Sequence, residues 1–387
     1  MSYRRLLHWG PITTLFIILS LFIISILTVL LWWYPKDVAG KINFVLLFFW
    51  LFNVLRNFLN AVWLGPGYLP FKWKPNVDSD IQFLQFCDVC CGYKAPRVHH
   101  CKTCSRCSMK MDHHCPWINN CVGHYNHKAF TLFLIFVILS CLHVTTIIGF
   151  CIYSNLLWRH GRIFITYDKN ALIQMNHAIM LILFFGFGMS LSVFLSVAFL
   201  FYFQLVSIIR NQTGIEAWIV EKAENRNRED KFIYPYDLGW LKNIKQVFTW
   251  SCYYIGDGID WPVREGSNTY ALTIEQLLQK EIKKANAVDY VACSVYSGYR
   301  FPITLGLKTC FDSPWSADSR IPLNIGDEFL ATRWRKHWVF GEKLQNSAES
   351  KLSSDKYGLE VKGWVPRCCL KDIYVKKNTS TRDKKYD

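Results

Sequence analysis

Four long apolar stretches constrain this chain more than any other feature of its sequence. They cover Ile12–Trp33, Ile42–Leu64, Phe130–Tyr153 and Ala178–Phe203. Each has at least the roughly 20 residues that a helix needs to cross the hydrocarbon core of a bilayer. Inside a bilayer every backbone polar group must be hydrogen-bonded within the protein, so such a segment folds as a helix. The sequence therefore predicts an α-helical polytopic membrane protein with four transmembrane helices.

Two of these stretches are open to other interpretations. The stretch Ile42–Leu64 carries Arg56 and several asparagines, which also fits a buried helix of a soluble protein. Its pairing with the first stretch across a short loop favours a membrane hairpin. The first stretch is too long for the apolar part of a signal peptide and lacks a small-residue cleavage site. We therefore expect it to be retained as a membrane span.

The basic residues are distributed as in a membrane protein. The net charge of the 387 residues is +15, yet 51% of them are hydrophobic and 16% are aromatic, so we expect no nucleic-acid partner. Lysine and arginine are concentrated near both termini and between the second and third stretches. Since cytosolic loops are enriched in these residues, we expect both termini and the loop 65–129 to lie in the cytosol.

Eight of the fifteen cysteines fall between Cys87 and Cys121, interleaved with four histidines. C-x-x-C pairs mixed with histidines in a reducing compartment are typical of zinc sites and not of a disulfide framework. Zinc in structural sites takes four nitrogen or sulfur ligands. The spacing predicts two interleaved, structural Cys3His sites. One would use Cys87, Cys90, His100 and Cys107, and the other Cys101, Cys104, His114 and Cys121.

This assignment leaves Cys115 without a metal, directly after Asp112, His113 and His114. A neighbouring imidazole and a nearby metal both favour the thiolate form of a cysteine. A carboxylate beside a histidine can hold the required tautomer, as in a catalytic triad. We therefore expect Cys115 to be a nucleophile, with His113 and Asp112 as its activating pair.

The same region resembles the cysteine-rich domain of the DHHC-type protein S-acyltransferases (palmitoyltransferases). The resemblance implies a two-step reaction in which Cys115 takes a palmitoyl group from palmitoyl-CoA as a thioester and passes it to cysteines of target proteins. It also implies that the eight ligands hold two structural Zn²⁺ ions. The residues that carry the resemblance, besides the Asp112–Cys115 tetrad, are Cys115-Pro116-Trp117, Asn119-Asn120-Cys121-Val122-Gly123 and Asn126-x-x-x-Phe130.

The chain departs from the family pattern at two places. The family has Asp-Pro-Gly after the second span, where this chain has Gly65-Pro66-Gly67, so another group must replace the carboxylate. The family's Thr-Thr-x-Glu appears as Thr213-Gly214-Ile215-Glu216, and we expect Glu216 to keep its contact with the cysteine-rich domain. The later Asn243-x-x-x-Val247-Phe248 fits the family's C-terminal aromatic and asparagine element.

Several side chains suit the binding of an acyl-CoA. Serines in the spans suit either a cavity for the acyl chain or ordinary helix packing by small residues. Basic residues at the cytosolic face either attract the CoA phosphates or form a solvated positive surface. The serines are Ser140, Ser190 and Ser192, and the basic residues are Lys94, Arg97, Arg106 and Lys110.

The last third of the chain changes to short runs of alternating polarity, which predict a small all-β barrel. Its motifs resemble a Src homology 3 domain, although Val339 and Cys368-Cys369 replace groove aromatics, so we expect partner binding other than ordinary proline-peptide recognition. Cys368 and Cys369 are also candidates for acylation. The expected domains are 1–64 (first two helices), 65–129 (cytosolic zinc domain), 130–203 (last two helices with a lumenal loop), 204–287 (cytosolic tail), 288–376 (barrel) and 377–387 (terminal tail).

The terminal Lys384-Lys385-Tyr386-Asp387 matches a di-lysine retrieval signal and predicts the endoplasmic reticulum membrane. Two other functions fit parts of the sequence. A membrane ubiquitin ligase of the RING type also interleaves zinc ligands, but it needs a further C-x-x-C pair where Cys121 stands alone. A zinc-stabilised membrane adaptor without acyl transfer would leave Cys115 idle.

Overall fold

The structure is a computed structural model that describes residues 3–159, 176–226, 231–250, 254–316, 318–344 and 361–372. Within them the chain forms two compact units, which divide between Ile274 and Glu275. The first unit holds the long helices and the cysteine-rich segment. The second unit holds an antiparallel sheet.

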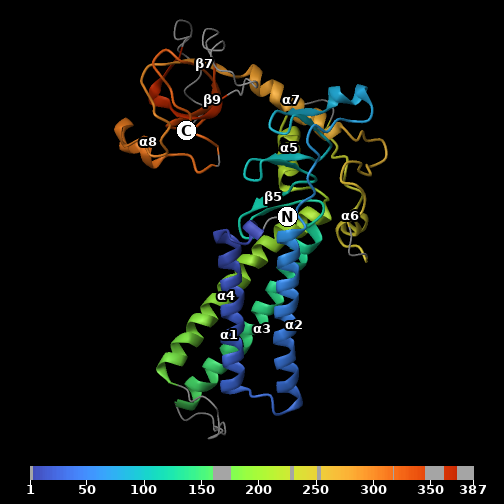
Figure 1. The fold of residues 1–387 in the computed structure, drawn as a ribbon, viewed down its shortest axis with the longest axis vertical. Coiled ribbons are helices and arrows are strands. Elements are labelled where there is room, and N and C mark those ends of the chain that lie inside the picture. Colours follow the sequence, from blue (N-terminus) through green and yellow to red (C-terminus); the bar gives the residue numbers. More distant parts are fainter. Residues whose placement is uncertain are drawn as a thin grey trace. The chain divides into compact units, whose positions relative to one another are not determined.

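Four long helices run side by side in the first unit (Figure 1). All four are long and apolar enough to cross a membrane, which confirms the four predicted spans. Polar side chains define where two of them begin: the Asp37 carboxylate accepts from Gly40 N at 2.9 Å, and the Asn176 amide oxygen accepts from Ile179 N at 2.9 Å. The helices are α1 (Trp9–Trp32), α2 (Val38–Trp63), α3 (His127–Arg159) and α4 (His177–Ile209).

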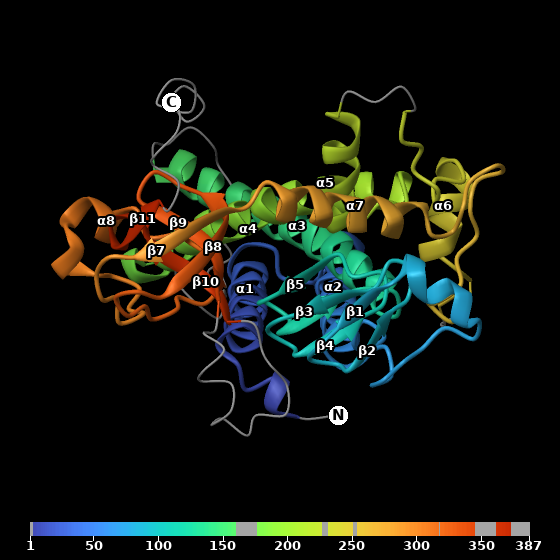
Figure 2. The ribbon, with the colours of Figure 1, turned by 90° about the horizontal axis from the view of Figure 1, so that it is seen from above.

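The cysteine-rich segment lies at one end of this bundle and is built from three two-stranded antiparallel hairpins, whose strands gather into one group in the view from above (Figure 2). A short 3-10 helix, Asp78–Phe83, precedes them. The strands are β1 (Gln85–Cys87), β2 (Gly92–Lys94), β3 (His99–Cys101), β4 (Arg106–Ser108), β5 (His113–Cys115) and β6 (Asn120–Val122). With three residues a strand, regular hydrogen bonding alone gives these hairpins little stability.

The chain after α4 returns to the cysteine-rich segment through α5 (Gly214–Glu224) and α6 (Trp240–Val247). The helix α7 (Ala271–Ala285) follows, and the division between the two units falls within it. Asn243 of α6 donates to Ile209 O at 2.7 Å and so satisfies a carbonyl at the end of α4.

The second unit contains a five-stranded antiparallel sheet in the order β10-β9-β8-β7-β11. The all-β prediction is confirmed and the fold is consistent with a Src homology 3 domain. Among the described residues, however, no pairing of β10 with β11 closes the sheet into a barrel. The strands are β7 (Val288–Ala292), β8 (Glu328–Trp334), β9 (Trp338–Lys343), β10 (Val361–Pro366) and β11 (Leu370–Asp372), with the short helices Ile303–Leu305, α8 (Leu307–Phe311) and Arg367–Cys369.

Side chains from these strands form the core of the second unit. Trp338, Val339 and Cys369 are fully buried in it, whereas Cys368 is exposed. Of these two candidates for acylation, Cys368 is the accessible one, whereas the Cys369 thiol belongs to the core. The predicted retrieval signal in residues 384–387 lies outside the described residues.

Candidate active site

Two of the hairpins bring predicted metal ligands directly opposite one another. His100 of β3 is the register partner of Cys107 in β4, and His114 of β5 is the partner of Cys121 in β6. The residues that follow the two C-x-x-C pairs, Cys91 and Ser105, have positive φ angles of 52° and 51°. Each pair is therefore followed by a sharp turn that directs the chain back toward its strand partner.

The eight predicted ligands form two groups, and within each group all donor atoms lie within 4.8 Å of one another. The groups are Cys87, Cys90, His100 and Cys107, and Cys101, Cys104, His114 and Cys121. Both histidines present Nδ1. The His100 Nδ1 lies 3.4, 3.6 and 3.7 Å from its three sulfurs, and the His114 Nδ1 lies 3.4, 3.7 and 3.7 Å from its own.

These distances test the fit of zinc. In a tetrahedral site with Zn–S near 2.3 Å and Zn–N near 2.0–2.1 Å, neighbouring nitrogen and sulfur ligands are about 3.6 Å apart. The measured separations in both groups match this value, and the donors are the soft nitrogen and sulfur atoms that zinc prefers. Each group thus has the geometry of a closed structural zinc site.

The strand β5 separates the metal ligand from the predicted catalytic residues. Successive side chains of a strand point to opposite faces, so His113 and Cys115 share one face while His114 points to the other. His114 therefore ties the strand to the second metal group and leaves the imidazole and thiol together. Cys115 is only 3% exposed.

Asp112 is held by three hydrogen bonds from different parts of the chain. Its Oδ2 accepts from His113 Nδ1 at 2.8 Å and from Gln204 Nε2 at 2.7 Å. Its Oδ1 accepts from Gly214 N at 2.7 Å. Gln204 in turn accepts from His127 Nε2 at 3.1 Å, so the orientation of its amide is determined. The carboxylate thus joins β5 to both α4 and α5.

These contacts set the ionisation of the pair. Burial alone would raise the pKa of Asp112, but the hydrogen bond and charge of His113, with the Gly214 amide, hold it well below its usual range. Burial alone would lower the pKa of His113, but hydrogen bonds to Asp112 and Cys115 raise it to about 10. The imidazole is therefore held as a cation between the carboxylate and the Cys115 sulfur.

Gln204 and Gly214 contact the predicted catalytic carboxylate but were not predicted from the sequence. Gln204 is a lone glutamine in an apolar span, and polar residues within spans mark functional sites, so this signal was available. Gly214 contributes only its backbone amide, and no side-chain pattern indicates that. A side chain at this position would still fit beside Asp112, because a Cβ added to Gly214 would lie 3.6 Å from the Asp112 Oδ1, an ordinary contact distance.

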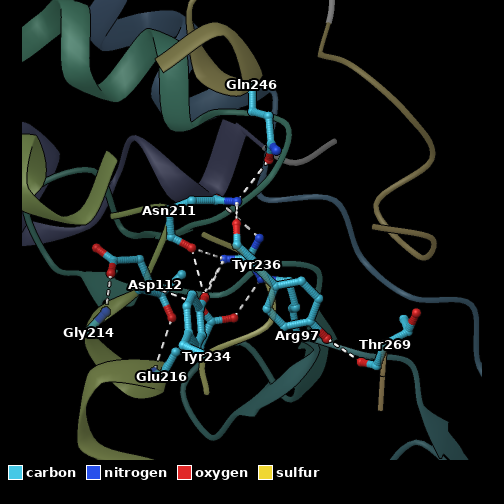
Figure 3. A network of polar contacts seen from close by, with 10 residues as sticks. Arg97, Asp112, Asn211, Gly214, Glu216, Tyr234, Tyr236, Gln246 and Thr269 are labelled. Carbon is cyan, nitrogen blue, oxygen red and sulfur yellow. Dashed lines mark hydrogen bonds and ion pairs between the residues drawn. The ribbon is translucent and has the colours of Figure 1, made fainter. Parts of the chain in front are cut away.

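A buried ion pair joins α5 to the cysteine-rich segment (Figure 3). Arg97 Nε lies 2.7 Å from Glu216 Oε1 and Nη2 lies 2.8 Å from Oε2. Tyr234 donates to Glu216 at 2.7 Å, and Arg97 also donates to the Asn211 carbonyl at 2.7 Å. The expected contact of Glu216 with the cysteine-rich domain is confirmed, with Arg97 as its partner.

The same ion pair decides between the two roles left open for Arg97. Its guanidinium is fully buried and already paired, so it neither attracts CoA phosphates nor belongs to a solvated surface. Lys110 is also buried, at 4% exposed. Lys94 and Arg106 are partly buried, and Arg106 donates to Leu69 O at 3.1 Å.

Asparagine side chains fasten the catalytic hairpin to the membrane bundle. Asn120 donates to Val62 O at 3.0 Å and Asn126 donates to Ala61 O at 3.1 Å. These carbonyls belong to the last turn of α2, where backbone carbonyls have no hydrogen-bond donor within the helix. These hydrogen bonds fix the position of β6, and of its partner strand β5, relative to the end of α2.

Backbone contacts anchor the segment that lacks the family's acidic residue. Gly67 O accepts from Met109 N at 2.8 Å and Pro66 O accepts from Tyr125 N at 3.2 Å. Gly67 has a φ of +82°, and a Cβ there would lie 3.1 Å from the Tyr125 ring. Glycine at position 67, which the family pattern shares, therefore allows the chain to pack closely against Tyr125.

A small apolar cavity lies among the four long helices. Cys115 belongs to the same cluster of buried residues as Leu21, Val54 and Val137, which line this cavity. Of the three span serines, Ser140 lines the cavity, whereas Ser190 accepts a hydrogen bond from Thr145 at 2.8 Å. The thiol thus lies where an apolar space between the spans meets the cysteine-rich segment.

Comparison with known proteins agrees with this geometry. Residues 80–221 match the model of a family described as DHHC palmitoyltransferase. The chain is 44% identical to Palmitoyltransferase ZDHHC6 of Danio rerio, over 99% of this chain and 95% of that protein. It is 41% identical to Palmitoyltransferase ZDHHC6 of Homo sapiens, over 95% and 91%. Palmitoyltransferase ZDHHC20-A of Danio rerio is 37% identical over 47% of this chain and 48% of that protein.

Proposed function

The chain belongs to the DHHC palmitoyltransferase family, and we propose on that basis that Cys115 carries the acyl group as a thioester between palmitoyl-CoA and cysteines of target proteins. The protein is a protein S-palmitoyltransferase. The observation that carries the assignment is the chain of contacts from Asp112 through His113 to the Cys115 sulfur.

The residues present can perform both halves of the transfer. The Cys115 thiolate attacks the acyl carbon of the CoA thioester, and the bond from that carbon to the CoA sulfur breaks while CoA takes the proton of the His113 imidazolium. In the second half His113 accepts the proton of a target cysteine, whose sulfur attacks the acyl carbon and releases Cys115 as thiolate. Asp112 stabilises the imidazolium throughout.

The two metal groups support the acyl transfer without taking part in it. Zinc bound there would fasten the hairpins and add positive charge near the thiolate. Each group already offers four ligands, so no coordination position is left for substrate. We therefore assign Cys87, Cys90, His100 and Cys107, and Cys101, Cys104, His114 and Cys121, to two structural Zn²⁺ ions.

The apolar cavity is the place for the acyl chain. Burying each CH2 of the chain contributes about 0.8 kcal/mol. The cavity opens among helices that are long enough to span a bilayer, so the chain stays in apolar surroundings while the thioester meets Cys115.

The location and partners follow from the sequence. The excess of basic residues in the loop 65–129 and near the termini supports a cytosolic active site. The terminal di-lysine pattern supports residence in the endoplasmic reticulum membrane. The five-stranded sheet of the second unit, with Val339 buried in its core, supports a partner-binding role other than a common proline-peptide groove.

Acyl transfer to the purified protein tests the assignment. Wild type given an alkyne-tagged palmitoyl-CoA should take up label that hydroxylamine releases, and Cys115→Ser should take up none. The matched control is Cys91→Ser, because Cys91 neighbours the first metal group but belongs to neither. Wild type with two bound zinc ions and no label would contradict the proposal and favour a zinc-stabilised adaptor.

A further inference from the structure

A second, polar pocket lies on the side of the cysteine-rich segment where the tail packs against it. Residues from three parts of the chain line it: the segment before α3, the first turn of α3, and the tail around α6. They include Lys110, His124, His127, Gln246 and Tyr254.

Two buried polar atoms of this pocket have no partner among the described residues, namely His124 Nε2 and Gln246 Nε2. Gln246 Oε1 accepts from Asn211 at 3.1 Å (Figure 3), which leaves the NH2 group as the end without a partner. His124 is 93% buried, since 7% of it is exposed. A buried donor without a partner costs about 1–3 kcal/mol, so a ligand that accepts a hydrogen bond from the Gln246 NH2 group would recover this free energy.

Lys110 adds a cation to the same pocket. Its ammonium lies 5.4 Å from the centre of the Trp261 ring, and the described residues give it no hydrogen bond. The other lysine of the pocket, Lys128, is engaged, because it donates to Thr249 O at 2.6 Å. The aromatic wall is the stacked pair Tyr125 and Tyr254, whose ring centres are 3.6 Å apart.

The electrostatic balance of the pocket favours an anion. No carboxylate lines it. Burial and the charge of Arg97 lower the pKa of Lys110 to about 7, although Glu216 and Asp112 oppose this. Burial and the charge of Lys110 lower the pKa of His124 to about 4, opposed by a hydrogen bond to Gly256 and by Asp257. An anion in the pocket would stabilise the charged forms of both groups.

We propose that this pocket binds a phosphoryl group. Lys110 and the Gln246 amide donate to its oxygens, and the buried His124 ring joins them when it takes up a proton. Several donors converging from different elements suit a phosphoryl group, which has several acceptor oxygens and a negative charge. Basic sites at the cytosolic ends of membrane helices bind the phosphorylated headgroups of lipids, and His127 and Lys128 from the first turn of α3 line this pocket.

The pocket shares one residue with the active-site network. His127 lines the pocket and donates to Gln204, whose amide donates to Asp112. Only the side chain of His127 would therefore separate a phosphoryl group in the pocket from Gln204, which orients the catalytic carboxylate. The proposal concerns binding alone and does not depend on the thioester chemistry of Cys115.

Equilibrium dialysis of radiolabelled inorganic phosphate against the full-length protein in detergent tests this site. We expect saturable binding to wild type and to Cys115→Ser alike. Lys110→Met and His124→Phe should each weaken it by about 10- to 100-fold, the effect of losing a hydrogen bond to a charged group. Lys242→Met is the matched control, since Lys242 is exposed on the same helix as Gln246.

Competition then identifies the source of the phosphoryl group. Unlabelled inositol 1,4-bisphosphate and unlabelled CoA are added separately, and displacement of the labelled phosphate by either supports the proposal. Displacement by inositol 1,4-bisphosphate identifies a lipid headgroup as the source, and displacement by CoA identifies the acyl donor. Bound zinc and thermal unfolding report whether each variant is folded. Absence of saturable phosphate binding to wild type would overturn the proposal. So would equal affinities in Lys110→Met, His124→Phe and Lys242→Met.

Discussion

At the scale of single residues, the catalytic carboxylate depends on groups that are distant in sequence. His113 adjoins Asp112 in the chain, but Gln204 and Gly214 come from α4 and α5. Together with His113, they give the carboxylate hydrogen-bond partners in a buried position, where an unpaired charge would be costly. Asp112 can therefore orient His113 only when both helices are in place.

Replacing Gln204 with methionine should slow acylation of Cys115 by about 10- to 100-fold, because one hydrogen bond to a buried carboxylate is lost while the side-chain volume is kept. Single-turnover labelling with palmitoyl-CoA measures this. Thr146→Val is the control, since Thr146 is exposed on α3 and bonds only to Leu142 O of its own helix. A rate for Gln204→Met equal to that of the control would show that Gln204 does not position Asp112.

Sulfate binding to the polar pocket should weaken as the pH rises through about 7. Lys110 carries its proton below its pKa of about 7 and loses it above, so each bound anion must then recruit a proton. The affinity should fall by at most about tenfold per pH unit, and sulfate itself does not titrate in this range. Arg97, Asp112 and Glu216, which act on Lys110, keep their charges there. A flat profile from pH 6 to 9 would exclude Lys110 as a ligand.

At the scale of elements, side-chain ligands and ion pairs hold together strands and helices that are too short to be stable alone. The three hairpins have three residues a strand, and eight of their side chains or turn residues form the two metal groups. The helix α5 begins with a capping box in which Thr213 and Glu216 bond each other's backbone, and the same Glu216 receives Arg97. Each element is therefore anchored through particular side chains.

Removal of metal should abolish acylation even though Cys115 binds none. Cys87→Ala should lower the zinc content from two ions to one and reduce labelling strongly, because the first hairpins lose their anchor. Atomic absorption together with hydroxylamine-sensitive labelling measures both quantities. Cys91→Ser should keep two ions and full labelling. Full activity in a Cys87→Ala protein with one zinc would show that the first group does not support the site.

Breaking the buried ion pair should destabilise the first unit. Glu216→Leu leaves the Arg97 guanidinium buried without its partner, which costs about 3–5 kcal/mol. Thermal unfolding in detergent should therefore shift to a lower temperature. The double variant Arg97→Met with Glu216→Leu should regain part of the loss, because two apolar side chains replace two charges. A single variant as stable as wild type would contradict a structural role for the pair.

At the scale of the whole molecule, the membrane helices form both the support of the active site and its apolar cavity. The end of α2 holds the catalytic hairpin through Asn120 and Asn126, and all four spans line the cavity. The proposed acyl-chain site and the proposed nucleophile therefore depend on the same bundle.

Filling the cavity should shift the preferred acyl donor toward shorter chains. Ser140→Phe places a ring in the space among the helices, and each CH2 that no longer fits forfeits about 0.8 kcal/mol of burial. Labelling by donors of graded chain length measures the preference. Ser192→Phe is the control, because Ser192 is exposed on α4 and bonds only to Gly188 O. An unchanged preference in Ser140→Phe would place the chain elsewhere.

Much of the fold could be predicted because its causes are local in the chain. An apolar run longer than a bilayer is thick must be helical, whatever surrounds it, and C-x-x-C pairs with histidines present metal donors through local turns. The placement of His113, His114 and Cys115 on alternate faces likewise follows from strand geometry alone.

Tertiary structure decided which distant groups meet. The partners Gln204 and Gly214 of Asp112, the burial of Arg97 against Glu216, and the unpaired donors around Lys110 arise only when α4, α5 and the tail pack on the hairpins. Packing among the strands of the second unit likewise buried Cys369 in the core of that unit. Periodicity and spacing describe neighbours along one element, whereas hydrogen bonding and desolvation depend on neighbours in space. For these residues the spatial neighbours are determined only when the chain has folded.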